Sequence, residues 1–249
     1  MPAYPLRALV LRKTKLGETD LILTLLAADG RQVRAVAKGA RKSKSRLGAR
    51  VEPFSVLDLL LHSGRNLEII AEAETVATHD ALRADYDRTM AASVVVDVLD
   101  KGSMEGQAEP QLFEMALVTL DVMESAPVSA LEPLVLAFLL KSLAMHGYRP
   151  SLDRCAACGG EAEGPLAFSV EAGGILCGRC AAQGSSAQVI APAARDALRS
   201  MLRSRMADVP AIETDPAVAR DVRWIVRAYT GFHIPARLRA LDYYLGQAR

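Results

Sequence analysis

Long apolar runs are scarce in this chain of 249 residues. The most apolar stretch, Leu134–Leu140, ends at Lys141 and is far shorter than the about 20 residues that a helix needs to cross a bilayer. The opening residues, MPAYPLRALVLRKTK, lack the apolar core of a signal peptide. We therefore expect no membrane association and no export, and a cytoplasmic location.

The motifs of nucleotide-dependent and hydrolytic enzymes are also missing. The chain contains neither a G-x-x-x-x-G-K-[ST] loop nor a G-x-G-x-x-G fingerprint, so nothing supports ATP or dinucleotide chemistry. There is no G-x-S-x-G element, and none of the four histidines begins the H-x-E element of a zinc deaminase. The sequence therefore predicts a protein that is not an enzyme.

Positive charge, by contrast, is concentrated near the N-terminus. Residues 1–50 hold 12 Lys and Arg against 3 Asp and Glu, although the whole chain has a net charge of only +1. The segment Lys38–Arg50, KGARKSKSRLGAR, holds six basic residues and no acid. Such a split favours a polyanionic partner such as nucleic acid. The alternative is a solvated, mobile basic loop without a partner.

We expect this basic segment and the strand before it to line a groove that follows phosphates. The predicted DNA-binding residues are Arg31, Arg34, Lys38, Arg41, Lys42, Lys44, Arg46 and Arg50. Aromatic residues for base stacking are few, because residues 1–79 contain only Tyr4 and Phe54, and Phe54 is expected in the core. The contact should therefore be mainly electrostatic, indifferent to sequence and weakened by salt, with both single- and double-stranded DNA as partners.

The spacing of apolar residues predicts an α+β fold. Short apolar runs separated by turn residues indicate five strands, at 6–13, 20–26, 31–37, 51–62 and 67–78. They suit a five-stranded OB-type β-barrel, although another small barrel would fit as well. Helical spacing follows, with helices expected at 110–125, 130–146, 192–206, 217–229 and 235–245. We predict an OB-fold domain at 1–79 and an all-helical domain at 80–249, with an insert at 151–184.

The four cysteines of the chain form two Cys-x-x-Cys pairs inside this insert. Cys155 and Cys158 are separated by 18 residues from Cys177 and Cys180, a spacing typical of a structural site for one Zn²⁺ ion. Four thiolates fill the coordination sphere and leave no open position for substrate. Two disulfides or four unlinked thiols are the alternatives. His146, near the insert, is expected to cap the end of a helix.

The residues resemble the RecO family of recombination mediators. The resemblance lies in ALVLRKTKLGETDLILTLLAADG, AKGARKSKSR, VEPFSVLDL, GYRPSLDRCAACG to GGILCGRC, and FHIPARLRALDYY, in that order along nearly the whole chain. It implies an OB barrel, a helical domain and a zinc-bearing insert. It also implies strand annealing, cooperation with RecR, contact with single-stranded-DNA-binding protein and an indirect part in RecA loading. By motif match, Lys38, Arg41, Lys42 and Arg46 inherit the DNA role.

Two other functions compete with a recombination mediator. The first is an RNA-binding OB-fold protein with a structural zinc knuckle. The second is a zinc-dependent hydrolase, which the closed set of four ligands disfavours. Near the C-terminus, Arg223, Arg227, Arg237 and Arg239 lie among aromatic residues. They suggest either a second DNA contact or a packed amphipathic helix.

Overall fold

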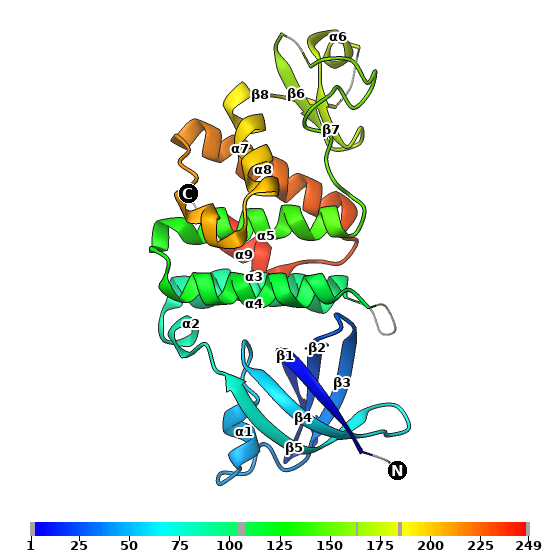
Figure 1. Cartoon of the computed structure of the whole chain (residues 1–249), viewed down its shortest axis with the longest axis vertical. Helices are drawn as coiled ribbons and strands as arrows, with labels where there is room; N and C mark the ends of the chain where they lie inside the picture. Colours follow the sequence, from blue (N-terminus) through cyan, green and yellow to red (C-terminus); the bar gives the residue numbers. More distant parts are fainter. Residues whose placement is uncertain (1–2, 104–107, 163, 184–185, 248–249) are drawn as a thin grey trace. The chain divides into compact units, whose positions relative to one another are not determined.

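A computed structural model describes residues 3–103, 108–162, 164–183 and 186–247. Its contacts divide the chain into two compact units (Figure 1). The first unit comprises residues 1–125 and 238–249, and the second comprises residues 126–237. Residues 163 and 184 of the predicted insert lie outside the described residues.

The first unit begins with a closed five-stranded barrel, as the sequence predicts. Its strands are β1 (Ala3–Leu16), β2 (Asp20–Ala27), β3 (Gln32–Ala37), β4 (Val56–His62) and β5 (Glu68–Ala77). They are hydrogen-bonded in the order β1-β2-β3-β5-β4, and β1 pairs with β4 to close the ring. All pairings are antiparallel except the short parallel pair of β3 with β5. Closure leaves no exposed sheet edge for another chain to pair with.

Alternating apolar side chains fill the barrel. Ala8 and Val10 of β1, and Leu23 and Leu25 of β2, point into one buried cluster. The residues between them are not exposed, however, because β1 is buried continuously from Ala8 to Leu11. Helix α3 packs against β1 and β2 and covers this outer surface. A stretch of β1 is therefore apolar on both faces.

Helices complete the first unit. Besides the short α1 (Arg46–Arg50) between β3 and β4, they are α2 (Asp80–Ala84), α3 (Tyr86–Gly102), α4 (Pro110–Ser125) and α9 (Arg239–Gln247). His79 joins strand β5 to helix α2 in a left-handed conformation, with a φ of 50°. Its Nδ1 lies 2.7 Å from the carbonyl oxygen of Phe54, and its Nε2 lies 2.9 Å from a carboxylate oxygen of Asp121. Phe54 itself is buried, as predicted.

The second unit is built around helix α5. Its helical elements are η1 (Val128–Ala130), α5 (Leu131–Met145), α6 (Gly178–Ala181), α7 (Pro192–Arg203), η2 (Met206–Ala211) and α8 (Pro216–His233). The stretch Val128–Met145 has a mean hydropathy of 1.7, which would suit a membrane span, but 61% of it is buried inside the protein. Helices α7 and α8 and the η2 turn pack against α5. This helix is therefore the core of the unit, as the sequence predicts.

The second unit also contains a small sheet, for which the sequence analysis assigned no strands. Strands β6 (Leu166–Ser169), β7 (Gly174–Leu176) and β8 (Gln188–Ile190) form a sheet in the order β7-β6-β8. Strand β6 is buried throughout, and Phe168 contacts Tyr229 of α8 edge to face, with ring centroids 5.6 Å apart. The sheet supports the cysteine-rich segments.

Two turn glycines provide a matched test of the barrel. Gly17 and Gly30 both have positive φ, at 58° and 86°. A Cβ on Gly30 would meet the backbone oxygen of Glu109 at 2.1 Å, whereas a Cβ on Gly17 would meet nothing within 4 Å. We expect Gly17→Ala to cost about 1 kcal/mol through backbone strain alone. Gly30→Ala should cost about 2 kcal/mol more because of the clash.

Urea unfolding of both variants beside the wild type measures the difference. Equal destabilisation by the two substitutions would contradict the close packing of Glu109 on this turn.

Candidate nucleic-acid interface and metal centre

The basic segment between β3 and β4 packs against the barrel. It contains a short helix, α1 (Arg46–Arg50), whose N-cap Ser45 accepts a hydrogen bond from the backbone nitrogen of Gly48. Ala40 is buried, and Leu47 packs against the barrel core. Two apolar side chains therefore anchor a segment whose charged side chains face solvent.

The start of the segment lies beside the turn between β1 and β2. The backbone nitrogen of Arg41 donates to the carbonyl oxygen of Thr19 at 2.9 Å, and its guanidinium donates to that of Gly17 at 2.9 Å. The backbone nitrogen of Gly39 donates to the Asp20 carboxylate at 2.8 Å. This hydrogen bond, then that of Thr19, holds the pKa of Asp20 below its ordinary value, and Lys38 and Lys42 lower it further.

The predicted DNA-binding residues lie in several places on the barrel. Lys38, Lys42, Lys44 and Arg46 are exposed on the basic segment. The Arg50 guanidinium donates to the carbonyl oxygen of Ala73 on β5 at 2.6 Å, so it is partly engaged within the fold. Six of the eight predicted residues, including Arg41, therefore lie on the basic segment.

Arg31 and Arg34 lie apart from the segment, where β3 begins. Both line a small cavity in the barrel wall. Arg31 is held by Asp29, which accepts from its backbone nitrogen at 3.1 Å and from its Nε at 2.8 Å. Arg34 is exposed and pairs with none of the side chains in the described ranges.

Lys15 is a cationic residue that the sequence analysis did not single out. It is exposed near the end of β1, two residues before Gly17, whose carbonyl oxygen accepts from Arg41. Lys15 is paired with Leu21 in the β1–β2 hairpin, and the turn of that hairpin contacts Arg41 of the basic segment through Gly17. The register of the hairpin is needed to see that Lys15 lies on the same hairpin that Arg41 contacts.

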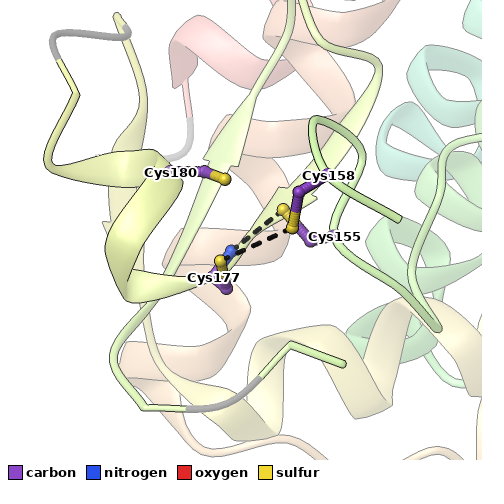
Figure 2. A group of neighbouring side chains, drawn as sticks. All are labelled: Cys155, Cys158, Cys177 and Cys180. Atoms are coloured by element: carbon purple, nitrogen blue, oxygen red, sulfur yellow. Dashed lines mark hydrogen bonds between the residues drawn. The ribbon is translucent and has the colours of Figure 1, made fainter. Parts of the chain in front are cut away.

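The four cysteines converge on one point, as Figure 2 shows. Their sulfur atoms all lie within 4.8 Å of one another, and the Sγ atoms of Cys158 and Cys177 are 4.0 Å apart. This distance is too long for a disulfide. It is close to the edge of about 3.8 Å that a tetrahedron with metal–sulfur bonds of about 2.3 Å would have. The donor set therefore fits a metal ion.

Local backbone geometry places each pair of thiols. The backbone nitrogen of Gly159 donates to the carbonyl oxygen of Cys155 at 2.9 Å, and Gly159 has a φ of 70° that permits this tight turn. In the second pair, Cys177 is the N-cap of α6, so one helical turn brings Cys180 back toward it. The sheet joins the two halves, since the backbone nitrogen of Ala156 donates to the carbonyl oxygen of Ile175.

The electrostatics of the cluster favour a bound cation. Burial raises the pKa of Cys155, but hydrogen bonds from the backbone nitrogens of Cys177, Cys158 and Ala157 outweigh this and lower the pKa to about 6. Hydrogen bonding to Cys177, then to the other two thiols, raises the pKa of Cys180 to about 12. The thiols are thus coupled: the pKa values of Cys155 and Cys177 are lowered while that of Cys180 is raised, so the four do not ionise together without a cation. A metal ion would provide the charge that lets all four become thiolates.

Two further sequence predictions concern helix residues. The Nδ1 atom of His146 donates to the carbonyl oxygen of Ser142 at 2.7 Å, so His146 caps the end of α5 as predicted. Arg223 of α8 donates to both carboxylate oxygens of Glu132 on α5, at 2.7 and 2.8 Å. This pairing supports the packed-helix interpretation for Arg223.

These features define a class of protein: a closed five-stranded barrel with an ordered basic segment, joined to a helical unit with a four-thiol cluster. The family model described as "Recombination protein O N terminal" matches residues 1–79. The one described as "Recombination protein O C terminal" matches residues 83–242.

Curated relatives agree with both matches. A protein of Frankia casuarinae named "DNA repair protein RecO" is 40% identical over 248 residues, covering 98% of each chain. A protein of that name from Nocardioides sp. is 39% identical, covering 96% of this chain and 98% of the relative. One from Streptomyces griseus is 38% identical, covering 94% and 96%. The chain belongs to the RecO family of DNA repair proteins.

From the lowered pKa of Asp20 we predict how the attachment of the basic segment responds to pH. Because the pKa of Asp20 is lowered in the folded state, its stabilising contribution is present above the unfolded value of about 3.9 and is lost as pH falls through the folded value. We expect Asp20→Asn to speed hydrogen exchange at Gly39 severalfold at neutral pH, because an amide oxygen is a weaker acceptor than a carboxylate.

Hydrogen exchange read by mass spectrometry or NMR measures this effect. Asp58→Asn is the control, because Asp58 pairs with Arg7 elsewhere on the barrel. Unchanged exchange at Gly39 in Asp20→Asn would show that the carboxylate does not hold the segment.

Proposed function

We propose that this protein is a recombination mediator that binds single- and double-stranded DNA and anneals complementary strands. In this proposal it acts in the cytoplasm without catalysing a reaction. It cooperates with RecR, contacts single-stranded-DNA-binding protein and thereby assists the loading of RecA. Membership of the RecO family supports the assignment, and the charges on the barrel support the way in which DNA would be bound.

A contrast between two groups of cations carries the DNA-binding proposal. On β1, three basic side chains each form an ion pair with a carboxylate: Arg7 with Asp58, Arg12 with Asp100 and Lys13 with Glu52. On the basic segment, Lys44 and Arg46 form neither an ion pair nor a hydrogen bond with any side chain that the structure describes. Cations without internal partners can bind phosphates without first breaking an internal pair.

The segment's attachment also supports DNA binding. Ala40 and Leu47 pack into the barrel, so the segment is already folded against the barrel in the absence of a ligand. Binding a strand then costs less conformational entropy than it would for a free loop. Arg31, Arg34, Lys38, Arg41, Lys42, Lys44, Arg46 and Arg50 are the proposed DNA contacts, with Lys15 added to them.

We propose Zn²⁺ as the ion of the four-cysteine site. All four donors are thiols, which suit zinc in a tetrahedral site, and such a site has no position for a substrate. Bound there, the ion would supply crosslinking of the two Cys-x-x-Cys turns. Cys155 and Cys158 would hold it from one turn, and Cys177 and Cys180 from the start of α6. Its role is structural in this proposal.

We expect Arg41→Glu with Lys42→Glu to weaken binding to every DNA sequence alike. The slope of log affinity against log salt should fall by about one for each lost phosphate contact. Arg205→Glu with Arg220→Glu is the matched control, since it makes the same charge change at exposed positions of the second unit. Fluorescence anisotropy over a salt series measures both, and an unchanged slope would remove these two residues from the interface.

The same variants test the function itself in an annealing assay. Complementary strands coated with single-stranded-DNA-binding protein should anneal with the wild type and the control, but much more slowly with Arg41→Glu and Lys42→Glu. If the wild type does not anneal DNA and binds RNA tightly instead, the RNA-binding alternative is favoured.

We expect Cys177→Ser to reduce bound zinc from about one ion per chain to nearly none, because three thiolates and a hydroxyl form a much weaker site. The melting temperature of the second unit should fall, while DNA affinity changes less than about twofold, because the proposed contacts lie in the first unit. Elemental analysis, calorimetry and anisotropy measure these three quantities. The control Ala157→Ser, an exposed position between two ligands, should keep the ion. A wild type without stoichiometric zinc would refute the metal assignment.

A further inference from the structure

Three metal-ligating side chains meet where the barrel joins the helices of the first unit. His79 lies between β5 and α2, whereas Asp121 and Glu124 lie on α4. One atom of each, a ring nitrogen of His79 and one oxygen of each carboxylate, lies within 4.8 Å of the other two. Among the described residues, this cluster and the four cysteines are the two groups that gather at least three such atoms. The cluster shares no residue with the cysteine site or with the proposed DNA contacts.

The ring of His79 faces a hydrogen-bond acceptor at each nitrogen. Its side chain is only 2% exposed, and its Nδ1 lies 2.7 Å from the carbonyl oxygen of Phe54, so Nδ1 carries a proton. A neutral imidazole has a single N–H, and its Nε2 therefore presents a lone pair to the Asp121 carboxylate, 2.9 Å away. Such a contact is favourable only when a cation, either a proton or a metal ion, lies between the two acceptors. Histidines that bind metal ions usually donate their other N–H to a carbonyl or carboxylate oxygen in this way.

The C-terminal end of α4 adds negative charge to the cluster. Asp121 and Glu124 both lie at this end, and the last turn of the helix contains no basic residue. The free carbonyl groups at the end of a helix carry partial negative charge, which disfavours carboxylates and favours cations. Arg88 of α3 donates to the carbonyl oxygen of Met123 here, but neither carboxylate forms an ion pair with a lysine or arginine in the part of the chain that the structure describes. The cluster therefore has two negative charges without a lysine or arginine to balance them.

We propose that His79, Asp121 and Glu124 bind one divalent metal ion of octahedral preference, such as Mn²⁺. A charge of +2 balances the two carboxylates, and carboxylate oxygens suit ions of this class. With metal–ligand bonds of about 2.1 Å, neighbouring ligands of an octahedron are about 3.0 Å apart, which agrees with the 2.9 Å between Nε2 and the Asp121 oxygen. A tetrahedral zinc site with similar bonds would need about 3.4 Å. The side chain of Asp121 is 67% exposed, so the ion can enter from solvent.

An ion in this site would join parts of the first unit that are far apart in the sequence. His79 is hydrogen-bonded to Phe54, which has a φ of 73° in the turn that leads into β4. The carboxylates belong to α4, so the ion would connect this helix to the turn through the ring of His79. An ion that binds only the folded state stabilises it. We therefore expect Mn²⁺ to raise the melting temperature of the full-length protein.

Titration of the full-length protein with Mn²⁺, followed by electron paramagnetic resonance, tests the proposal. Mn²⁺ is the suitable probe because four thiols favour softer ions. The wild type should bind one Mn²⁺ at this site, and Asp121→Asn and Glu124→Gln should each weaken this binding at least about tenfold, because affinity follows the number of charged ligands. Glu114→Gln is the matched control and should bind as the wild type does. It makes the same charge change at an exposed position of the same helix.

The paramagnetism of Mn²⁺ tests His79 without any variant. The bound ion should broaden the ring signals of His79 in NMR spectra more strongly than those of the other three histidines. Failure of the wild type to bind Mn²⁺ would overturn the proposal. Affinity that is unchanged in both Asp121→Asn and Glu124→Gln would also overturn it, and so would ring signals of His79 that stay sharp while the ion binds.

Discussion

The short parallel pairing of β3 with β5 is the constraint on which the barrel depends. It joins only Ala35 with Glu68 and Val36 with Ile69, yet without it the sheet would stay open, with β3 and β5 as unprotected edges. The same pairing brings the start of β5 beside Arg34. The polar cavity is thus a by-product of closing the barrel, because residues far apart in the sequence meet where the two parallel strands begin.

The cations on the barrel are of two kinds: some form ion pairs within the fold, and others form none with the described residues. Arg12 illustrates the structural kind: it pairs with Asp100, whose side chain is only 4% exposed, and so it ties β1 to α3. Burial raises the pKa of Asp100, but hydrogen bonds from Lys101 and Arg12 outweigh this effect and lower the pKa. On the basic segment the attachment is made instead by backbone groups, Asp20 and two apolar side chains. Arg41 and Arg50 also donate to backbone carbonyl oxygens of the barrel, whereas Lys44 and Arg46 form no hydrogen bond or ion pair with a described residue.

Local sequence patterns were sufficient to predict much of this structure. Alternating apolar residues located the five strands, and the spacing of Cys155, Cys158, Cys177 and Cys180 predicted that the thiols would converge. The features that the sequence patterns did not predict depend on tertiary contacts. Helix α1 lies in a stretch of Lys, Arg, Ser and Gly and is anchored by Leu47. The left-handed backbone of His79 is fixed by partners at Phe54 and Asp121, far away in the sequence.

Helix α9 returns to the first unit after the whole second unit has been made. Leu241 and Leu245 are buried, the backbone nitrogen of Ala240 donates to Asp97 of α3, and the Tyr243 hydroxyl lies 3.0 Å from that of Tyr86. During synthesis the barrel and its first helices emerge early. They must nevertheless wait for a segment made after the second unit, and the part of α3 that contacts α9 stays uncovered until then. Folding of the first unit is therefore coupled to synthesis of the second, although the strands of the barrel are made well before it.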